Sequence, residues 1–505
     1  MARKPQLSFD RGTLILHPPP RGKAWMDFAE WDDRIEKFRI PAIHYRALVE
    51  KMRASGVEFD DNAARFAPLE LQPSHDLTPF PHQQEALQAW KAAHRQGVVV
   101  LPTGSGKSFL ALLAIAATPR NTLIVVPTLD LMHQWYAQLE ASFPGIELGL
   151  LGGGSRDRTP LLVSTYDSAA IHAETLGSQY GLVIFDECHH LPSDFTRVIA
   201  EYSLAPYRLG LTATPERSDG KHEDLNQLIG PEVYRRSAEQ LSGETLADYE
   251  VRQIKVQLSP GERDRYSQLI EQRNAFMRSA NISFGGLGGW QRFIQVCSRS
   301  AEGRQAMLAH HKAKAIALGN EAKLNLLEEL LAEHHPQKTL IFTNDNATVY
   351  QISLAFLIPA ITHKTPVKER HDILVKFRTG DYRALVVANV LDEGVDVPDA
   401  TIAIFLAGTG SSRQFIQRLG RILRRGSQPG KRAILYEVIA EDTVEEAASQ
   451  RRRTSPAKIP GKSPDSESSR RGQLELLPSP APRPARSPSP SPRPARPMSC
   501  VPARR

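Results

Sequence analysis

The segment LPTGSGKS, from Leu101 to Ser108, constrains the fold of this 505-residue chain more than any other feature. An apolar run, VVV, precedes it and a longer apolar stretch, FLALLAIAA, follows it, which predicts a strand, a loop and a helix in that order. Gly104 and Gly106 let the loop backbone curl, so that its N–H groups and the helix amino terminus converge on one point that suits a phosphate. The alternative is a chance glycine-rich turn, because Leu101 stands where the general pattern has its first glycine.

The side chains of this loop predict a nucleotide site that includes a metal ion. Lys107 would neutralise the β- and γ-phosphate oxygens, and the Ser108 hydroxyl would coordinate Mg²⁺. ATP and Mg²⁺ are therefore the predicted cofactors. The loop residues expected around the triphosphate are Thr103, Gly104, Ser105, Gly106, Lys107 and Ser108.

A second polar segment, DECH, follows the apolar run GLVIF and so lies at the carboxyl end of a predicted strand, where ligands collect in parallel sheets. Asp186 would hold Mg²⁺ through water, and Glu187 would orient and deprotonate the attacking water. Cys188 with two adjacent histidines suggests a metal site, but the spacing is not that of zinc ligands.

For His189 we therefore favour a coupling role. It would contact the strand that ends in Thr212 and Thr214, and so link the hydrolytic carboxylates to the rest of the molecule. A third segment, QRLGRILRR, places Gln417, Arg421 and Arg424 on one face of a helix. Such a stripe is often only a solvated surface, but phosphoryl transfer gains much from an arginine near the developing charge. We expect Arg421 and Arg424 to be arginine fingers and Gln417 to sense the γ-phosphate.

The alternation of short apolar runs with helical patterns predicts an α/β fold with parallel sheets. The runs fall into two series, which indicates two α/β domains. The first series is Val98 to Leu101, Thr122 to Val126, Leu161 to Ser164, Leu182 to Phe185 and Arg208 to Leu211. The second series is Thr339 to Phe342, Ala384 to Val387, Ile402 to Leu406 and Ala433 to Ile439.

The rest of the chain is divided by composition. Residues 1–78 predict a small α+β module, with a strand near Gly12 to Leu16 and a helix near Ile43 to Ser55. Residues 246–316 interrupt the alternation and predict a helical, thumb-like insertion, which would be a lever, a DNA-contacting element or simply a packing subdomain. The two α/β domains then cover residues 79–245 and 317–449, and residues 450–505 form a basic tail rich in Pro, Ser and Arg that is predicted to be disordered.

Charge and apolar content exclude some classes of protein. The 55 residues from Arg451 carry 13 Lys and Arg against 3 Asp and Glu, so they contribute +10 to the total of +7 and the preceding 450 residues carry −3. Net charge therefore does not indicate a nucleic-acid-binding core. The apolar runs are shorter than the ~18 residues that span a bilayer. The amino terminus lacks the apolar segment of a secretory signal and there are only 3 cysteines, so a cytoplasmic location is expected.

Together with these three segments, further stretches resemble the superfamily 2 helicases, and within them the XPB family of archaea and bacteria. The resemblance extends from the amino terminus to about Ile439. The matching stretches are HQQEAL (82–87), VVPTLDLMHQW (125–135), VSTYDSA (163–169), LTATPERSDG (211–220), LIFTND (340–345), AITH (360–363) and VLDEGVDVPDA (390–400). The resemblance implies two RecA-like domains that close on ATP, a DNA-sensing amino-terminal module and ATP-driven movement on DNA in the 3′ to 5′ direction, with DNA repair as the expected setting and the nucleoid as the expected location.

The resemblance also implies roles for single residues. Gln83 would read the adenine edge, and Gly394 and Asp396 would join the nucleotide site to the second domain. Contacts with the phosphates of DNA would come from Pro127, Thr128, Thr165 and Thr343. Such contacts predict little sequence preference and strong salt dependence.

Two positions depart from the family pattern. The sequence has Arg217-Ser218-Asp219 where the family has Arg-Glu-Asp, which weakens the expected strand-separating wedge and allows duplex translocation without unwinding. Phe80 stands where the family has an arginine that stacks on adenine, and its ring would stack instead. An RNA helicase is the rival enzyme class, and a scaffold with a vestigial nucleotide site is the rival outside enzymes.

The tail contains one segment that resembles the short peptides by which bacterial repair proteins bind the replicative sliding clamp. Its matching residues are Gln473, Leu474, Leu476 and Leu477, although the usual pattern ends in Phe. An incidental apolar pentad is the alternative. A repair nuclease is a further expected partner, since archaeal relatives work beside one, and no membrane partner is expected.

Overall fold

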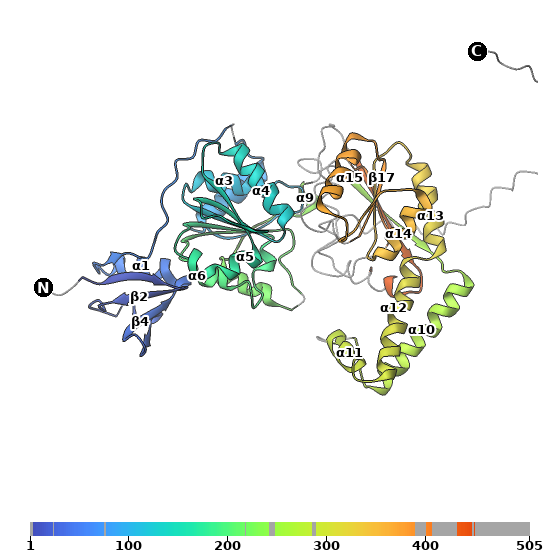
Figure 1. Cartoon of the computed structure of the whole chain (residues 1–505), viewed down its shortest axis with the longest axis horizontal. Helices are drawn as coiled ribbons and strands as arrows, with labels where there is room; N and C mark the ends of the chain where they lie inside the picture. Colours follow the sequence, from blue (N-terminus) through green and yellow to red (C-terminus); the bar gives the residue numbers. More distant parts are fainter. Residues whose placement is uncertain are drawn as a thin grey trace, which may run out of the picture. The chain divides into compact units, whose positions relative to one another are not determined.

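The computed structural model describes residues 4–23, 25–74, 77–217, 219–241, 248–284, 289–388, 400–406, 432–446 and 449. Within these residues three β-sheets are formed by consecutive parts of the chain, and helices pack against each of them (Figure 1). The predicted α/β class with parallel sheets is confirmed, because the two larger sheets are parallel in nearly all of their strand pairs.

The amino-terminal part forms a small sheet of strand order β3-β4-β2-β1-β5. The strands are β1 (Gln6–Asp10), β2 (Thr13–His17), β3 (Glu30–Asp32), β4 (Lys37–Pro41) and β5 (Asp60–Asp61). Short helical turns, η1 (Met26–Phe28) and η2 (Ala42–His44), lead to helix α1 (Tyr45–Ala54). Along β2, the buried residues Leu14 and Leu16 alternate with residues that are half-buried or exposed, as expected for a sheet with one covered face. The side chains of Leu14 and Leu16 pack with Leu48 and Met52 of α1.

The first α/β part is built on an eight-stranded sheet of order β13-β6-β12-β11-β7-β10-β8-β9. Its strands are β6 (Gln96–Val100), β7 (Thr122–Val126), β8 (Leu148–Gly152), β9 (Ser155–Arg156), β10 (Leu161–Thr165), β11 (Leu182–Asp186), β12 (Tyr207–Thr212) and β13 (Glu232–Arg235). The five strands of the predicted first series are all present, whereas β8, β9 and β13 were not predicted. They lie at or near the two edges of the sheet, where burial is incomplete and the apolar pattern is weak.

Helices cover both faces of this sheet (Figure 1). On one face lie α2 (Pro81–Ala92), α3 (Lys107–Ala117) and α4 (Leu129–Ser142). On the other lie α5 (Tyr166–Ile171), α6 (Ala173–Leu176), α7 (Val198–Glu201) and α8 (Leu225–Leu228). Neighbouring residues of one strand therefore enter different cores: Val99 packs with the first group of helices and Val98 with the second. Three short elements complete this part: η3 (Cys188–His190), η4 (Lys221–Asp224) and α9 (Ala238–Leu241).

The second α/β part has a six-stranded parallel sheet of order β14-β19-β18-β15-β17-β16. Its strands are β14 (Asp248–Val256), β15 (Thr339–Phe342), β16 (Ala360–Ile361), β17 (Ala384–Val387), β18 (Ile402–Phe405) and β19 (Arg432–Ala440). Helices α13 (Glu321–Glu333) and α14 (Asn346–Phe356) pack on one face, and α15 (Val367–Thr379) packs on the other through Phe377. The four predicted strands of the second series are present.

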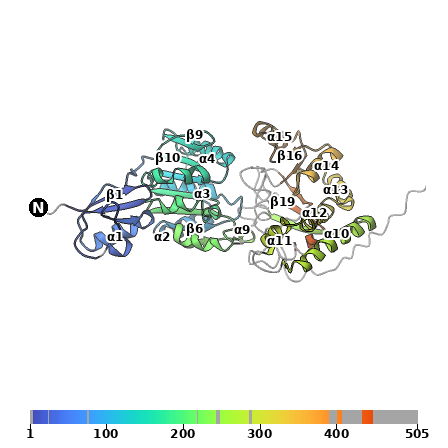
Figure 2. The ribbon, with the colours of Figure 1, turned by 60° about the horizontal axis from the view of Figure 1, so that its bottom comes forward.

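Between β14 and α13 in the sequence lie three further helices, α10 (Pro260–Ser279), α11 (Gly289–Cys297) and α12 (Ala301–Leu318). Helices α10 and α12 lie side by side, and α11 packs at one end of the pair (Figures 1 and 2). The start of the helical insertion predicted at residue 246 is wrong. Residues Asp248–Val256 form β14, which pairs along its whole length with β19. No helix within the described residues is long and apolar enough to cross a membrane.

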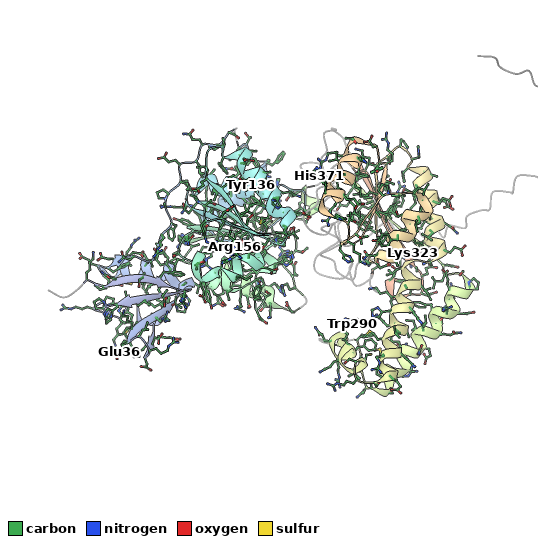
Figure 3. The ribbon with its side chains drawn as sticks, viewed as in Figure 1. Glu36, Tyr136, Arg156, Trp290, Lys323 and His371 are labelled. Carbon is green, nitrogen blue, oxygen red and sulfur yellow. The ribbon has the colours of Figure 1, made fainter. Side chains whose placement is uncertain are left out.

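A buried ion pair fastens the second sheet to α13. Lys323, labelled in Figure 3, is 1% exposed, and its Nζ lies 2.6 Å from Glu445 Oε2. Lys323 Nζ also donates to the Leu406 carbonyl, and Glu445 Oε2 accepts from Ala440 N. Burial lowers the pKa of the Lys323 ammonium, so this cation depends on its carboxylate partner.

We expect Glu445→Ala to destabilise the second α/β part by about 3–5 kcal/mol, because it leaves an unpaired buried charge. The double variant Lys323→Met with Glu445→Leu should recover most of this loss, since it removes both charges. Urea unfolding of the full chain measures both. The control is Glu446→Ala, which breaks a partly exposed pair with Lys255 and should cost at most about 1 kcal/mol. Equal losses from Glu445→Ala and Glu446→Ala would contradict this account.

Candidate active site

Three neighbouring strands of the first α/β part end at the same edge of the sheet. In the register of the sheet, Val100 of β6 pairs with Thr212 of β12, and Asp186 of β11 pairs with Leu211 of β12. Because these strands are parallel, the residues that follow them meet at their carboxyl ends. The phosphate-loop segment and the DECH segment therefore lie together, although about 80 residues separate them in the sequence.

The phosphate-loop segment connects β6 to α3, the order predicted from sequence. Gly104 and Gly106 have φ values of +88° and +82°, in the left-handed region that glycine adopts without strain. Lys107 is the first residue of α3 and is 9% exposed. Its Nζ donates to the Leu101 carbonyl at 3.3 Å and lies 3.8 Å from Glu187 Oε1. Ser108 lies in the first turn of α3, half-buried.

Helix α2 holds this loop through two side chains of its first turn. Gln83 Nε2 donates to the carbonyls of Ser105 and Gly106, and Gln83 Oε1 accepts from Phe80 N. His82 Nε2 lies 2.9 Å from the Ser105 carbonyl. Gln83 is 1% exposed, so its amide supports the loop in this structure rather than facing outward. Reading an adenine edge would require the Gln83 amide to exchange at least one of these bonds.

We expect Gly106→Ala to lower the affinity for ATP at least about tenfold, equivalent to about 1.4 kcal/mol. A Cβ at this position would lie 2.3 Å from Gln83 Nε2, in addition to the strain of a left-handed alanine. Titration with a fluorescent ATP analogue measures the change. Gly145→Ala is the matched control, because Gly145 has a φ of +84° and open space around its Cβ. Equal effects of the two variants would show that strain alone, and not the Gln83 contact, is responsible.

Asp186 is held by a tryptophan that the sequence analysis did not assign to the site. Trp135 of α4 donates its Nε1–H to Asp186 Oδ2 at 2.9 Å, and Glu187 N donates to Asp186 Oδ1. The pKa of Asp186 is raised to about 6, mainly because the carboxyl group is buried and secondly because the Glu187 carboxylate lies beside it. Trp135 lies in the matching stretch VVPTLDLMHQW. The signal that could have identified it is that a buried indole N–H needs a hydrogen-bond acceptor.

Glu187 lies at the centre of a short polar network. Its backbone has a φ of +48°, which is unusual for a residue with a side chain. Thr212 Oγ1 donates to Glu187 Oε2 at 3.4 Å and lies 3.1 Å from His189 Nδ1, while Thr214 N donates to Thr212 Oγ1. The structure therefore brings together the three residues for which a coupling role was predicted. The neighbouring Cys188 is fully buried, and burial raises the pKa of its thiol well above the ordinary value.

Arg217 extends this network beyond the strand end. Its guanidinium donates to the His189 carbonyl at 2.7 Å and forms a two-point ion pair with the Asp219 carboxylate. The hydrogen bonds from Arg217 lower the pKa of Asp219 and the pairing raises the pKa of Arg217. Arg217 thus ties the segment after β12 to the DECH segment. The sequence analysis named Arg217 only as part of the tripeptide that departs from the family pattern.

The predicted DNA-contacting residues do not share one environment. Thr128 and Thr165 are the N-cap residues of α4 and α5, where their hydroxyls accept from Leu131 N and Ser168 N. Pro127 is half-buried beside Thr128. Thr343 is fully buried: its hydroxyl donates to the Asp345 carbonyl and its N–H donates to the Val387 carbonyl, so in this structure it is not open to a DNA phosphate.

Phe80, the predicted stacking residue, is 54% exposed at the start of α2. Its ring is nearly parallel to that of His82, with centroids 6.1 Å apart. Several predicted residues lie outside the described residues: Gly394, Asp396, Gln417, Arg421, Arg424, Gln473, Leu474, Leu476 and Leu477, together with Ser218 of the departing tripeptide.

The residues at these strand ends fit magnesium-bound ATP. Gly106 in the left-handed region lets the loop close over the amino terminus of α3, where free N–H groups attract phosphate. The Thr103 hydroxyl is buried without a hydrogen-bond partner among the described residues, which leaves a donor for a ligand oxygen. Lys107 supplies the cation, and Ser108 and Asp186 supply oxygen ligands of the kind Mg²⁺ takes beside a nucleotide.

Comparison with protein families matches three parts of the chain. Residues 7–63 match the Xeroderma pigmentosum group B helicase damage recognition domain. Residues 76–217 match the family described as Type III restriction enzyme, res subunit, and residues 322–426 match the helicase conserved C-terminal domain.

Whole-chain comparisons agree with these matches. The chain is 41% identical over 424 residues to the DNA 3′-5′ translocase XPB2 of Sulfurisphaera tokodaii, covering 84% of this chain and 95% of that protein. It is 30% identical over 370 residues to the DNA 3′-5′ helicase XPB of Mycobacterium tuberculosis, covering 71% of this chain and 60% of that protein. Among solved structures, the Hef helicase domain of Pyrococcus furiosus aligns with a TM-score of 0.48 and 19% identity, over 74% of this chain and 98% of that chain. With a relative this similar over nearly its whole length, the chain belongs to the XPB family of DNA 3′-5′ helicases and translocases.

Proposed function

We propose that this chain is a DNA-dependent ATPase that uses ATP and Mg²⁺ to move on DNA in the 3′ to 5′ direction, and that it acts in DNA repair at the nucleoid. The observation that carries the proposal is the meeting of Lys107, Asp186 and Glu187 at neighbouring strand ends, with Lys107 Nζ 3.8 Å from Glu187 Oε1. Membership of the XPB family supports DNA as the substrate.

Each residue of the site has a distinct task in this proposal. Magnesium-bound ATP supplies the phosphoryl group that is cleaved. Lys107 and the loop N–H groups bind the phosphates, and Ser108 and Asp186 hold the metal. Glu187 orients a water and accepts its proton, because its Oε2 faces the polar network rather than bulk solvent and its side chain is only 12% exposed. Arg421 and Arg424 of the second α/β part then stabilise the developing charge, while Gln417, Gly394 and Asp396 sense the nucleotide.

Coupling to DNA runs through the network around Glu187. Thr212 and His189 contact the Glu187 carboxylate, and Arg217 contacts the backbone of His189. If DNA displaced the segment after β12, the movement would be transmitted to the Glu187 carboxylate through two contacts, from Arg217 to His189 and from His189 to Glu187. This physical connection is the route by which we propose that DNA stimulates hydrolysis.

A specific observation favours duplex translocation without efficient unwinding as a second candidate. Arg217 and Asp219 are joined by a two-point ion pair, and Ser218, between them, replaces the acidic residue of the family pattern. In this segment Arg217 is neutralised by Asp219, and the acidic side chain expected for the wedge is missing. The relative from Sulfurisphaera tokodaii is itself named a translocase.

The test compares three nucleic acids and two activities. We expect single-stranded or duplex DNA to raise the rate of ATP hydrolysis at least about tenfold and RNA of the same sequence to raise it less than twofold. Triplex displacement measures translocation, and a forked duplex measures strand separation. Equal stimulation by RNA would contradict the DNA assignment. Displacement of the triplex without separation of the fork would favour the translocase over the helicase.

We also propose that the tail segment QLELL binds the replicative sliding clamp, as its pattern of Gln473, Leu474, Leu476 and Leu477 suggests. The test is binding of a tail peptide to the clamp. A peptide with Leu474→Ala and Leu476→Ala should bind at least about tenfold more weakly. Equal binding of the two peptides would reject this partner. A repair nuclease remains a proposed partner on the family resemblance alone.

A further inference from the structure

The amino-terminal sheet shares a core with the first α/β part. Leu204, which precedes β12, packs in the same cluster as Leu7 and Leu48 of the amino-terminal sheet and α1. Gly12 lies beneath the ring of Tyr202, where an added Cβ would come within 2.3 Å of Tyr202 Cγ. Arg65 N donates to the Ser178 carbonyl. The contact between these parts is therefore tight, and a cavity within it has defined walls.

A cavity of about 320 Å³ opens between α1 and the first α/β part. Its lining residues are Tyr45, Arg46, Val49, Glu50, Arg53, Phe66, Arg120, Pro206 and Tyr207. Arg120 precedes β7, and Tyr207 begins β12, so the cavity lies at the amino-terminal ends of these strands. The candidate active site lies at their carboxyl-terminal ends, roughly 17 Å away for strands of five residues.

Two of the three arginines that line this cavity have no carboxylate partner among the described residues. Arg46 is neutralised by Glu50 at 2.8 Å and donates to the carbonyls of His94 and Pro206. For Arg53 and Arg120, no side-chain hydrogen bond or ion pair occurs among the described residues, and Glu50 is the only acid of the lining. Among the lining residues, three arginines therefore face one glutamate, and the nearby Asp61 carboxylate accepts from the Tyr45 hydroxyl rather than from an arginine of the described chain.

The ring of Tyr207, one of the lining residues, contacts two guanidinium groups. The guanidinium carbons of Arg46 and Arg95 lie 5.8 Å and 5.5 Å from the centre of the Tyr207 ring. Arg95 and the preceding His94 both have positive φ values, of +61° and +56°, in the turn between α2 and β6. This turn is tied to the cavity through Arg46, which donates to the His94 carbonyl.

We propose that this cavity binds the phosphate monoester group of a small molecule, at a site separate from the candidate active site. A monoester carries up to two negative charges, which match the two unpaired guanidinium groups, and the planar guanidinium favours two-point binding of phosphate oxygens. The volume of about 320 Å³ accommodates the phosphate with an attached sugar. A bound phosphate would link Arg53 of α1 to Arg120 of the first α/β part, and would strengthen the docking of the amino-terminal sheet.

The experiment uses the full chain with Lys107→Ala, so that binding at the phosphate loop is weakened. Calorimetric titration with ribose 5-phosphate should show binding, and ribose should show none. Adding Arg53→Gln and Arg120→Gln should weaken binding of ribose 5-phosphate at least about tenfold, because each lost charge-assisted hydrogen bond costs about that factor. The matched control removes two charges elsewhere in the same part: Arg156→Gln with Arg158→Gln, both exposed (Arg156 is labelled in Figure 3).

Conservative variants guard against misfolding. Arg53→Lys and Arg120→Lys keep the charge but lose the planar fork, and each should weaken binding by a smaller factor than the glutamine variant at the same position. Three results would overturn the proposal: no binding of ribose 5-phosphate to the Lys107→Ala chain, equal binding after Arg53→Gln with Arg120→Gln, or binding only of DNA that carries a terminal phosphate. The last result would assign the cavity to a DNA end.

Discussion

Glu187→Gln is expected to lower the DNA-stimulated rate of ATP hydrolysis by a factor of about 10²–10⁴, which is the range for loss of a general base. The amide keeps the size of the carboxylate but cannot accept a proton from water. Thr212 Oγ1 would still find an oxygen at this position, and Lys107 would still be free to bind phosphate, so the fold and the affinity for ATP should be retained.

Phosphate release in the presence of duplex DNA measures the rate, and titration with a fluorescent ATP analogue measures affinity. Glu147→Gln, at an exposed position before β8, is the matched control and should hydrolyse ATP at the normal rate. A Glu187→Gln chain with normal turnover would remove Glu187 from the role of base. Loss of ATP affinity together with turnover would point instead to a structural role in the network with His189 and Thr212.

Lys107→Ala is expected to weaken ATP binding strongly and to abolish hydrolysis. Charge-assisted hydrogen bonds contribute about 1.5–3 kcal/mol each, so the affinity for ATP should fall by about 10- to 150-fold. The lysine is also the cation nearest the two carboxylates, and the Lys107 charge lowers the pKa of Asp186 against the larger effect of burial. Its removal should therefore raise the pKa of Asp186 further and weaken the binding of Mg²⁺ near neutral pH.

The contrast between the two variants is the informative result. Lys107→Ala should lose affinity and turnover, and Glu187→Gln should lose turnover alone, because one residue binds the phosphates and the other acts on water. Lys91→Ala, at the end of α2, is the matched control for the loss of a lysine. Normal ATP affinity in the Lys107→Ala chain would contradict the assignment of the phosphate loop.

Local sequence patterns identified the central strands well. The predicted limits of β7, β15 and β17 are those of the structure, because buried parallel strands are short, continuous apolar runs with clear ends. The phosphate loop was also predictable, since its glycines and the order of strand, loop and helix are local features. Strand β14 was not predictable in this way, because its partner β19 lies more than 180 residues further along the chain.

The partners of the site residues were harder to predict than the residues themselves. DECH could be read directly, but Trp135 became part of the site only because α4 packs beside β11 and its indole N–H must find an acceptor. Gln83 was expected to face adenine, yet its amide supports the phosphate loop. The arginines of the cavity beside α1 formed no pattern in the sequence, since Arg53 and Arg120 are brought together only by the docking of two folded parts.

By itself the sequence determined the class of fold and the family, and it singled out the residues that we propose for hydrolysis, because each of these depends on residue types at short spacing. Only the tertiary structure decided which side chains restrain those residues, how Arg217 reaches the backbone of His189 and where two arginines are left without an acid. The physical reason is that local backbone preferences act between near neighbours, whereas hydrogen-bond and charge partners are set by the order of strands in the sheet and by packing between distant segments.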